Sequence, residues 1–259
     1  MRTLALIVRI TCFNHLFLGL LLFASCSKPS SNRDLIEDGI YGQVKQLSLS
    51  VYETDSKNGG SKALTERHEY SYSQEGRVMQ QLTYNSGGAL KSKISYTRNP
   101  KTSNVSELKI YDGAGKMTMR YVFTYNSNSK ESGHTVYDSS GKIESRIVYE
   151  YSDANVRLGG VRYNQKGEII SIEKELYDTE NRLIKEVHVT QNREPIFQSI
   201  LIRDNNGAIT IQKLQFAGQK ARIRKFKSLR FDNLGSWTER SVYENGKLAE
   251  YVVRNMVYY

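Results

Sequence analysis

Glu173 and Glu175 are the residues whose type and spacing best fit acid–base chemistry. They are two positions apart, so on a β-strand both side chains lie on one face. A pair of carboxylates on one surface is what glycoside hydrolysis requires. Lys174 and Lys185 flank the pair in the sequence, however, and this arrangement favours a solvated, charged strand face. We therefore expect no catalytic residues here.

Three histidines could in principle bind a metal ion. His68, His134 and His188 lie far apart in the chain and have no cysteine partner. Metal sites that can be recognised from sequence place their ligands a few residues apart. The spacing predicts isolated surface histidines, no metal site and no cofactor. The glycines follow turns, so a phosphate-binding loop has no support either.

A basic segment near the C-terminus is the strongest local charge feature. It could bind an anionic polysaccharide, a lipopolysaccharide phosphate or an acidic partner. The alternative, which we favour, is a strand whose charges keep the sheet soluble and prevent edge pairing. Trp237 could stack on a sugar, but its place just after Gly235 favours a core position. The basic residues are Lys220, Arg222, Arg224, Lys225, Lys227 and Arg230.

Cys26 is the residue with the most definite predicted chemistry. An unbroken apolar run over 16–23 follows basic residues at Arg2 and Arg9. The run is too short to cross a bilayer as a helix but fits a secretory signal. If residues 1–25 are removed, Cys12 is lost and Cys26 is the only cysteine left, so no internal disulfide can form.

The segment Phe23-Ala24-Ser25-Cys26 resembles the lipobox of bacterial lipoproteins. The resemblance implies that Cys26 becomes the acylated first residue and anchors the protein to the membrane. The alternative is an ordinary secretory signal that leaves Cys26 as a free thiol. Residues 26–39 are polar and read as the acylated cysteine and a flexible tether, and residues 40–259 form the remaining domain.

The domain 40–259 is built from a repeated unit of about 13 residues. An aromatic residue, Asp or Asn, two variable residues, Gly, a polar residue and an apolar residue recur at 111–117, 137–143 and 163–169, which start 26 residues apart. Weaker copies start at Tyr72, Tyr84, Tyr96, Tyr125, Tyr151, Tyr177, Thr190, Arg203, Phe216, Phe231 and Tyr243. Asp or Asn can begin a type I turn and Gly can end it with positive φ, so each unit predicts one turn and one strand.

Alternation within these strands predicts the fold. Tyr121 and Phe123 share one face while Arg120 and Thr124 share the other, and Ile143, Ile147 and Tyr149 continue the pattern. The first strand is expected over 40–52. We expect an all-β protein: an antiparallel meander of about 14 short hairpin-repeat strands, forming a twisted or curled sheet that covers its tyrosine face.

The charge distribution bears on whether this sheet binds nucleic acid or spans a membrane. The formal net charge of +10 falls to +8 once Arg2 and Arg9 are removed, and the basic residues are spread among acidic ones. This distribution favours solvated strands over a nucleic-acid groove. A transmembrane barrel needs an uncharged outer band on every strand, and the segment 222–227 argues against one.

The unit Tyr-Asp-x-x-Gly-Lys-apolar resembles the YD repeats of Rhs-type proteins, and the segment 231–240 is similar to a variant in Rhs-like lipoproteins of Bacteroidota. The likeness spans about residues 66–250 and implies architecture more than activity. In large Rhs proteins such repeats enclose a toxin, whereas this chain looks too short for a closed shell.

Function is expected to be non-catalytic. We expect an outer-membrane lipoprotein, on the periplasmic face or the cell surface, that serves as a binding or scaffold module for an envelope glycan or protein. The acyl group expected on Cys26 is a palmitate-type chain. Two alternatives stay open: an envelope polysaccharide hydrolase, and an Rhs-associated accessory protein that binds a toxin.

Overall fold

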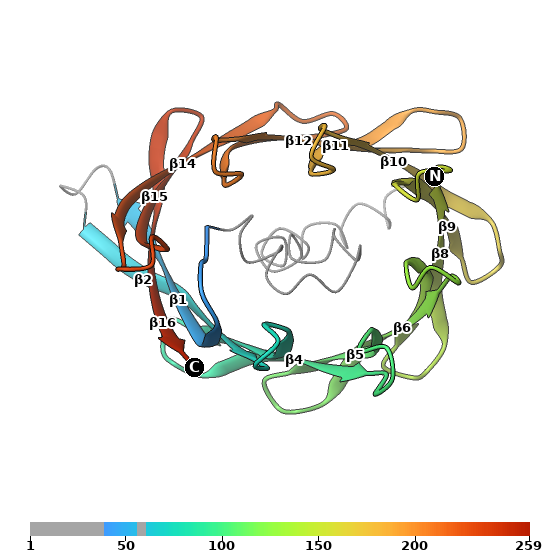
Figure 1. The fold of residues 1–259 in the computed structure, drawn as a ribbon. Helices are drawn as coiled ribbons and strands as arrows, with labels where there is room; N and C mark the ends of the chain where they lie inside the picture. Colours follow the sequence, from blue (N-terminus) through green and yellow to red (C-terminus); the bar gives the residue numbers. More distant parts are fainter. Residues whose placement is uncertain (1–38, 56–60) are drawn as a thin grey trace.

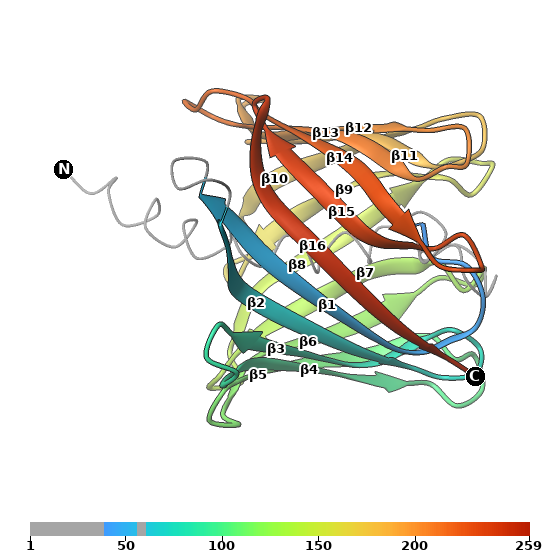
Figure 2. The ribbon, with the colours of Figure 1, turned by 90° about the vertical axis from the view of Figure 1, so that its left-hand side faces the viewer.

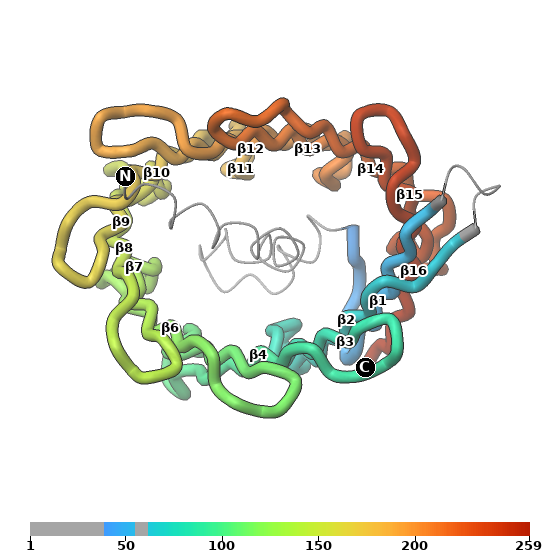
Figure 3. Tube along the Cα trace, turned by 180° about the vertical axis from the view of Figure 1, so that it is seen from behind, coloured from blue at the N-terminus to red at the C-terminus, as the bar shows by residue number. Residues whose placement is uncertain are grey.

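The computed structural model describes residues 39–55 and 61–259, and these form a single antiparallel sheet that closes into a barrel. Each strand pairs with its neighbours in the chain, and β1 pairs with β16 to complete the ring (Figures 1 and 3). The signal segment, Cys26 and nearly all of the expected tether lie outside the described residues. The strands are β1 (Val44–Asp55), β2 (Ser61–Tyr72), β3 (Val78–Asn85), β4 (Leu90–Arg98), β5 (Val105–Asp112), β6 (Met117–Tyr125), β7 (Glu131–Asp138), β8 (Ile143–Tyr151), β9 (Arg157–Asn164), β10 (Ile169–Tyr177), β11 (Leu183–Val189), β12 (Pro195–Arg203), β13 (Ile209–Phe216), β14 (Arg222–Phe231), β15 (Trp237–Glu244) and β16 (Lys247–Tyr258).

The expected all-β antiparallel class is confirmed, while the closure and the strand number go beyond the expectation of a curled sheet of about 14 strands. The 16 strands arise because the 14 repeat starts between Tyr72 and Tyr243 separate 15 strands. The remaining strand comes from the segment before Tyr72, where β1 and β2 are joined by a connection that lacks the repeat motif. The strands run obliquely within the barrel wall, tilted relative to the barrel axis (Figure 2).

The repeated turn has the predicted mechanism. Asp112 accepts hydrogen bonds through Oδ1 from the backbone N–H groups of Ala114 and Lys116, at 3.0 and 2.9 Å. Gly115 follows with φ of 82° and donates its N–H to the Asp112 carbonyl at 3.0 Å. Asn181, which replaces this glycine in one unit, adopts φ of 59°, as predicted for the next-best left-handed residue.

The first strand begins later than expected, at Val44 instead of residue 40. Gly39 and Gly42 have φ of 67° and 87°, which no extended strand can contain. The segment 39–43 instead lies inside the ring (Figure 1). There Ile40 is 1% exposed and the Tyr41 N–H donates to Ser236 Oγ at 2.8 Å.

The barrel has two chemically different faces. Cross-strand partners share a face, and the pairing registers carry one alternating set of side chains around the whole ring. That set includes the buried residues Leu49, Ile147 and Leu201, so it faces inward. The other set includes Val148 and Ile202, exposed by 44% and 50%, and faces outward.

Bulges next to the turns shift this alternation by one position. The sequence pattern predicts Ile143 on the same face as Ile147, but this prediction is wrong. An extra residue in β8, Glu144, shifts the register so that Ile143 pairs with Tyr137 on the outer face, where Ile143 is 44% exposed. Among the described residues, no helix is long and apolar enough to cross a membrane.

The turn between β3 and β4 offers a test of the repeat, because two adjacent glycines differ there only in conformation. Gly88 has φ of 80° and open space where a Cβ would lie, whereas Gly87 has no positive φ. We expect Gly88→Ala to lower the free energy of unfolding by about 1 kcal/mol, the cost of a left-handed alanine. Gly87→Ala should leave it unchanged within about 0.5 kcal/mol. Urea denaturation measures both, and equal effects would contradict the turn assignment.

Candidate functional site

Ionisable side chains gather on the inner face of β7 to β11. Strand alternation turns Glu173 and Glu175 of β10 inward, and each is 6% exposed. The register pairs them with His188 and Glu186 of β11, respectively. Two arginines of β9, Arg157 and Arg162, reach the same region. We call this part of the inner face, with Glu173, Glu175, Glu186 and His188, the acidic wall.

Arg157 and Glu175 form the most enclosed ion pair of this wall. The guanidinium donates to both carboxylate oxygens, at 2.7 and 2.6 Å, and the side chains are 11% and 3% exposed. The Tyr177 hydroxyl donates to the same carboxylate. Arg157 also stacks over the ring of Tyr149 at 4.5 Å, and burial raises the pKa of the Tyr149 hydroxyl well above its usual range. Both oxygens of Glu175 are therefore engaged.

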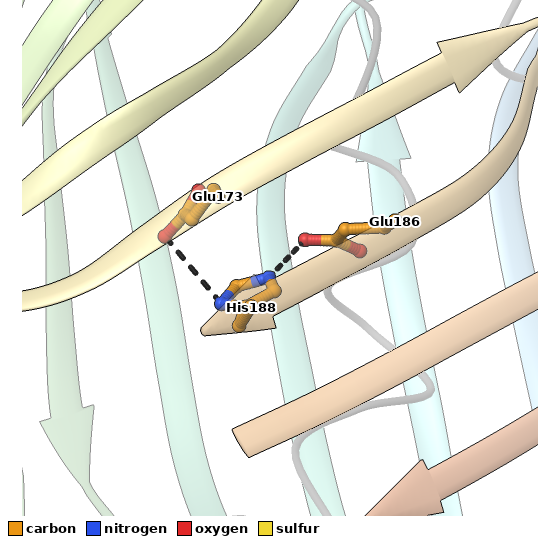
Figure 4. A group of neighbouring side chains, drawn as sticks. All are labelled: Glu173, Glu186 and His188. Atoms are coloured by element: carbon orange, nitrogen blue, oxygen red, sulfur yellow. Dashed lines mark hydrogen bonds and ion pairs between the residues drawn. The ribbon is translucent and has the colours of Figure 1, made fainter. Parts of the chain in front are cut away.

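His188 lies between two carboxylates (Figure 4). Its Nε2 is 2.5 Å from Glu186 Oε1 and its Nδ1 is 3.7 Å from Glu173 Oε1. Arg162 donates to the same Glu173 oxygen at 3.0 Å. Burial lowers the pKa of His188, but the hydrogen bond to Glu186 and the charges of both carboxylates outweigh burial, so the pKa is raised overall.

The other two histidines also face inward beside a glutamate. His134 Nδ1 lies 2.9 Å from Glu131 Oε1, and its ring is surrounded by those of Tyr121, Phe123 and Tyr149, at centroid distances of 5.6, 5.4 and 6.0 Å. On the far side of the barrel, His68 Nε2 is 3.5 Å from Glu66 and its Nδ1 is 3.1 Å from the Thr83 hydroxyl. The His68 hydrogen bond is the main cause that lowers the pKa of Glu66 to about 2.

Two sequence predictions are therefore wrong. The histidines are not isolated surface residues, since His68 is 6% exposed and His188 lies against two carboxylates. Glu173 and Glu175 do not form a solvated face. The lysines that suggested solvation lie on the opposite, outer face: Lys174 alternates with the two glutamates, and Lys185 pairs with the outward Leu176.

The basic segment is divided between the two faces of β14. Arg222 and Arg224 belong to the inner face, where Arg224 donates to Glu250 at 2.7 Å. Lys225 and Lys227 alternate with them and are exposed on the outer face. Lys220 lies in the preceding turn and is exposed, and Arg230 pairs with Glu239 at 3.0 Å. These six residues do not form a single patch.

Trp237 is a core residue, as predicted, with 3% exposure. Two inward arginines stack on its ring, Arg254 at 3.4 Å and Arg240 at 4.0 Å from the centroid. Its aromatic face is therefore taken by the protein's own cations.

One signal in the sequence marks the acidic wall of the barrel. Gly159 and Gly160 are adjacent in the middle of β9, where glycine often marks a close approach. A Cβ on Gly160 would lie 2.8 Å from Cδ1 of Tyr149, so glycine is what allows the Tyr149 ring to lie close to β9. The spacing Glu186-Val187-His188 also places both ligand-type side chains on one strand face.

Comparison with known proteins supports the fold and little more. No protein-family model and no curated protein matches the chain. A porin-like protein from Bacteroides uniformis superposes with a TM-score of 0.51 at 13% identity, over 85% of this chain and 100% of that one. This similarity shows a shared fold. The chain thus belongs structurally to the closed antiparallel barrels, with a charged inner wall.

Two further structures align more weakly. The structure of TcdB2-TccC3-Cdc42 aligns with a TM-score of 0.31 at 10% identity, over 78% of this chain and 14% of that one. A LolA superfamily protein from Nitrosomonas europaea aligns with a TM-score of 0.27 at 12% identity, over 90% and 92% of the two chains. Scores this low carry no argument about fold or function.

The Arg157–Glu175 pair predicts a strong dependence of stability on one carboxylate. We expect Glu175→Gln to lower the free energy of unfolding by about 3 kcal/mol, because it leaves a buried guanidinium without its counter-charge. The matched control is Glu107→Gln, which breaks the Arg120 pair on the outer face, where the two side chains are 33% and 21% exposed. The control should cost less than about 1 kcal/mol. Similar losses in both variants would show that the inner pair is not enclosed.

The raised pKa of His188 predicts a pH-dependent contribution to stability. Protonated His188 stabilises the folded state below its unfolded pKa of 6.5, and this contribution is lost as pH rises through the higher folded pKa. The stability advantage of the wild type over His188→Gln should therefore shrink as the pH rises above 6.5. Denaturation in buffer containing EDTA measures it. An advantage that stays constant or grows with pH would contradict the assignment.

Proposed function

We propose that this protein is a non-catalytic, lipid-anchored barrel of the bacterial cell envelope that serves as a binding module. The observation that carries the proposal is the distribution of charge: enclosed, mutually paired groups lie on the inner wall and solvated charges lie on the outer wall. The outer wall of such a protein can be solvated by water, and its inner wall and rims can contact a ligand. The remainder of the proposal concerns the setting, the anchor and the ligand.

The outer wall supports a position outside the bilayer. Lipid-facing strands of a membrane barrel carry an apolar band, and a basic residue near the bilayer midplane costs about 2–4 kcal/mol. Here outward basic residues occur within strands from β2 to β14. They include Arg67, Lys93, Lys109, Arg120, Arg146, Lys174, Lys213, Lys225 and Lys227. On this reading the attachment to the membrane is the acyl group expected on Cys26.

The arrangement of the acidic wall argues against a hydrolase. A glycosidase needs one carboxylic acid to protonate the leaving oxygen and a second carboxylate that is free either to activate a water or to attack the sugar. Both oxygens of Glu175 are engaged by Arg157, and Tyr177 donates to one of them. Glu173 is held by Arg162. Groups that are locked in this way support a binding or structural role.

The ligand that fits this chemistry is an envelope glycan. Inward aromatic rings such as those of Tyr121 and Phe123 can stack on sugar faces, and charges next to them, such as that of Glu131 beside His134, can bind amino substituents. The binding module could equally take an envelope protein as its partner in place of a glycan. The YD-like turn, whose hydrogen bonds recur from one unit to the next, supports relation to YD-repeat lipoproteins in architecture.

The anchor is tested by Cys26→Ala. We expect the wild-type protein in the membrane fraction, labelled by a clickable palmitate analogue, and the variant in the soluble fraction without label, since a lone cysteine carries the acyl chains. Cys12→Ala is the matched control and should behave as wild type. A Cys26→Ala protein that stays in the membrane fraction would refute lipid anchoring at this residue.

The binding surface is tested on an array of bacterial envelope polysaccharides. We expect Glu186→Gln on the inner wall to weaken glycan binding at least tenfold, whereas Lys225→Gln on the outer wall leaves it within twofold. Loss of binding in the outer variant alone would place the function on the exterior. Turnover of any glycan by the wild type would contradict the non-catalytic role.

A further inference from the structure

Glu173, Glu186 and His188 form a group that can coordinate a metal ion. Each offers one ligand atom, an imidazole nitrogen or a carboxylate oxygen, and the three atoms lie within 4.8 Å of one another. Two of the residues alternate on β11 and the third is opposite His188 on β10 (Figure 4). Because adjacent strands fix their backbones, only side-chain rotations are needed to bring the three atoms closer.

We propose that this group is a binding site for a divalent transition metal, with Zn²⁺ as the best match. One imidazole and two carboxylates are a donor set that Zn²⁺ accepts, with ligand distances of about 2.0–2.2 Å. Such distances require donor atoms roughly 3.3 Å apart around a tetrahedral ion. His188 Nδ1 is already 3.7 Å from Glu173 Oε1, and rotation of the Glu186 side chain can supply the rest of the contraction. Water would complete the coordination.

The surroundings supply what a metal site needs beyond its ligands. Arg162 donates to Glu173 Oε1, which fixes that carboxylate. The edge of the His188 ring lies against Phe197 at 5.5 Å between centroids, which restricts its rotation. Glu175 is neutralised by Arg157 and does not compete.

Charge balance favours a cation at this position. Glu173 and Glu186 together carry two negative charges, and Arg162 supplies one positive charge. The cluster therefore carries a net negative charge when His188 is neutral, and this charge attracts a cation. A ring nitrogen binds Zn²⁺ only without its proton, so any proton on that nitrogen is released when the metal binds.

His134 provides a matched control within the same barrel. It is an inward histidine paired with Glu131 at 2.9 Å, as His188 is with Glu186. Among the described residues, however, the only group of three candidate ligands is the one around His188. A histidine beside one carboxylate should bind Zn²⁺ much more weakly than a histidine beside two.

The experiment titrates the EDTA-stripped full chain with Zn²⁺ in competition with a chromophoric chelator at pH 7.5. We expect one equivalent bound by the wild type, a loss of at least tenfold in affinity for His188→Gln and for Glu186→Gln, and less than a twofold change for His134→Gln. Co²⁺ in place of Zn²⁺ should give a visible absorption band that His188→Gln shifts or removes. Circular dichroism confirms that each variant is folded.

Three results would overturn the site. The first is no stoichiometric binding by wild type, and the second is equal loss in the His134 and His188 variants. The third is weak binding of several equivalents that no variant changes, which would indicate surface adsorption only. If His188→Gln does not fold, the rise in Tm on adding Zn²⁺ is compared between wild type and Glu186→Asp. A larger rise in wild type supports the site, and no rise in wild type refutes it.

Discussion

The pairing of β1 with β16 is the interaction on which the rest of the structure depends. The two strands match over most of their length, with Leu49 opposite Arg254 and Val51 opposite Val252. This seam removes the two free edges that a sheet of this size would otherwise expose to other chains. It also fixes which alternate side chains face inward between the bulges, because cross-strand partners share a face around the ring.

The composition of the inner wall follows from that closure. Charged groups turned inward lose water and must find partners, and here glutamates meet arginines and histidines from neighbouring strands. Tyrosine side chains at the ends of β6 and β8 add hydrogen bonds to the preceding strands. The hydroxyls of Tyr125 and Tyr151 donate to the carbonyls of Val105 and Glu131, at 2.8 and 2.6 Å, each 20 residues back in the chain. The tyrosines that end β6 and β8 thus link their strands to the start of the preceding strand.

The turns and strands could be predicted from sequence because they are local. A unit with Asp at its start and Gly115 or Asn181 at its end specifies its own hydrogen bonds and its own positive φ. Alternation correctly grouped Tyr121 with Phe123 on the inner face. The same logic failed at Ile143, where a bulge near the turn changed the face.

Closure and the acidic wall could not be predicted because they depend on contacts distant in sequence. No local sequence feature of β1 or β16 predicts that Ser50 pairs with Val253. Alternation alone puts Lys174 on the face opposite Glu173, but only the closed ring makes the Glu173 face the enclosed one. His188 and Glu173 are 15 positions apart and become partners only through the β10–β11 register.

The most direct test of closure is a disulfide across the seam. In a chain whose own cysteines are replaced, Ser50→Cys with Val253→Cys joins β1 to β16, and Ser50→Cys with Arg67→Cys joins β1 to β2 as a positive control. Directly opposed residues of antiparallel strands are close enough for such a bond. A closed barrel predicts intramolecular oxidation of both pairs, shown by mass spectrometry of the monomer. Oxidation of the β1–β2 pair alone would mean that the sheet is open and that no enclosed inner wall exists.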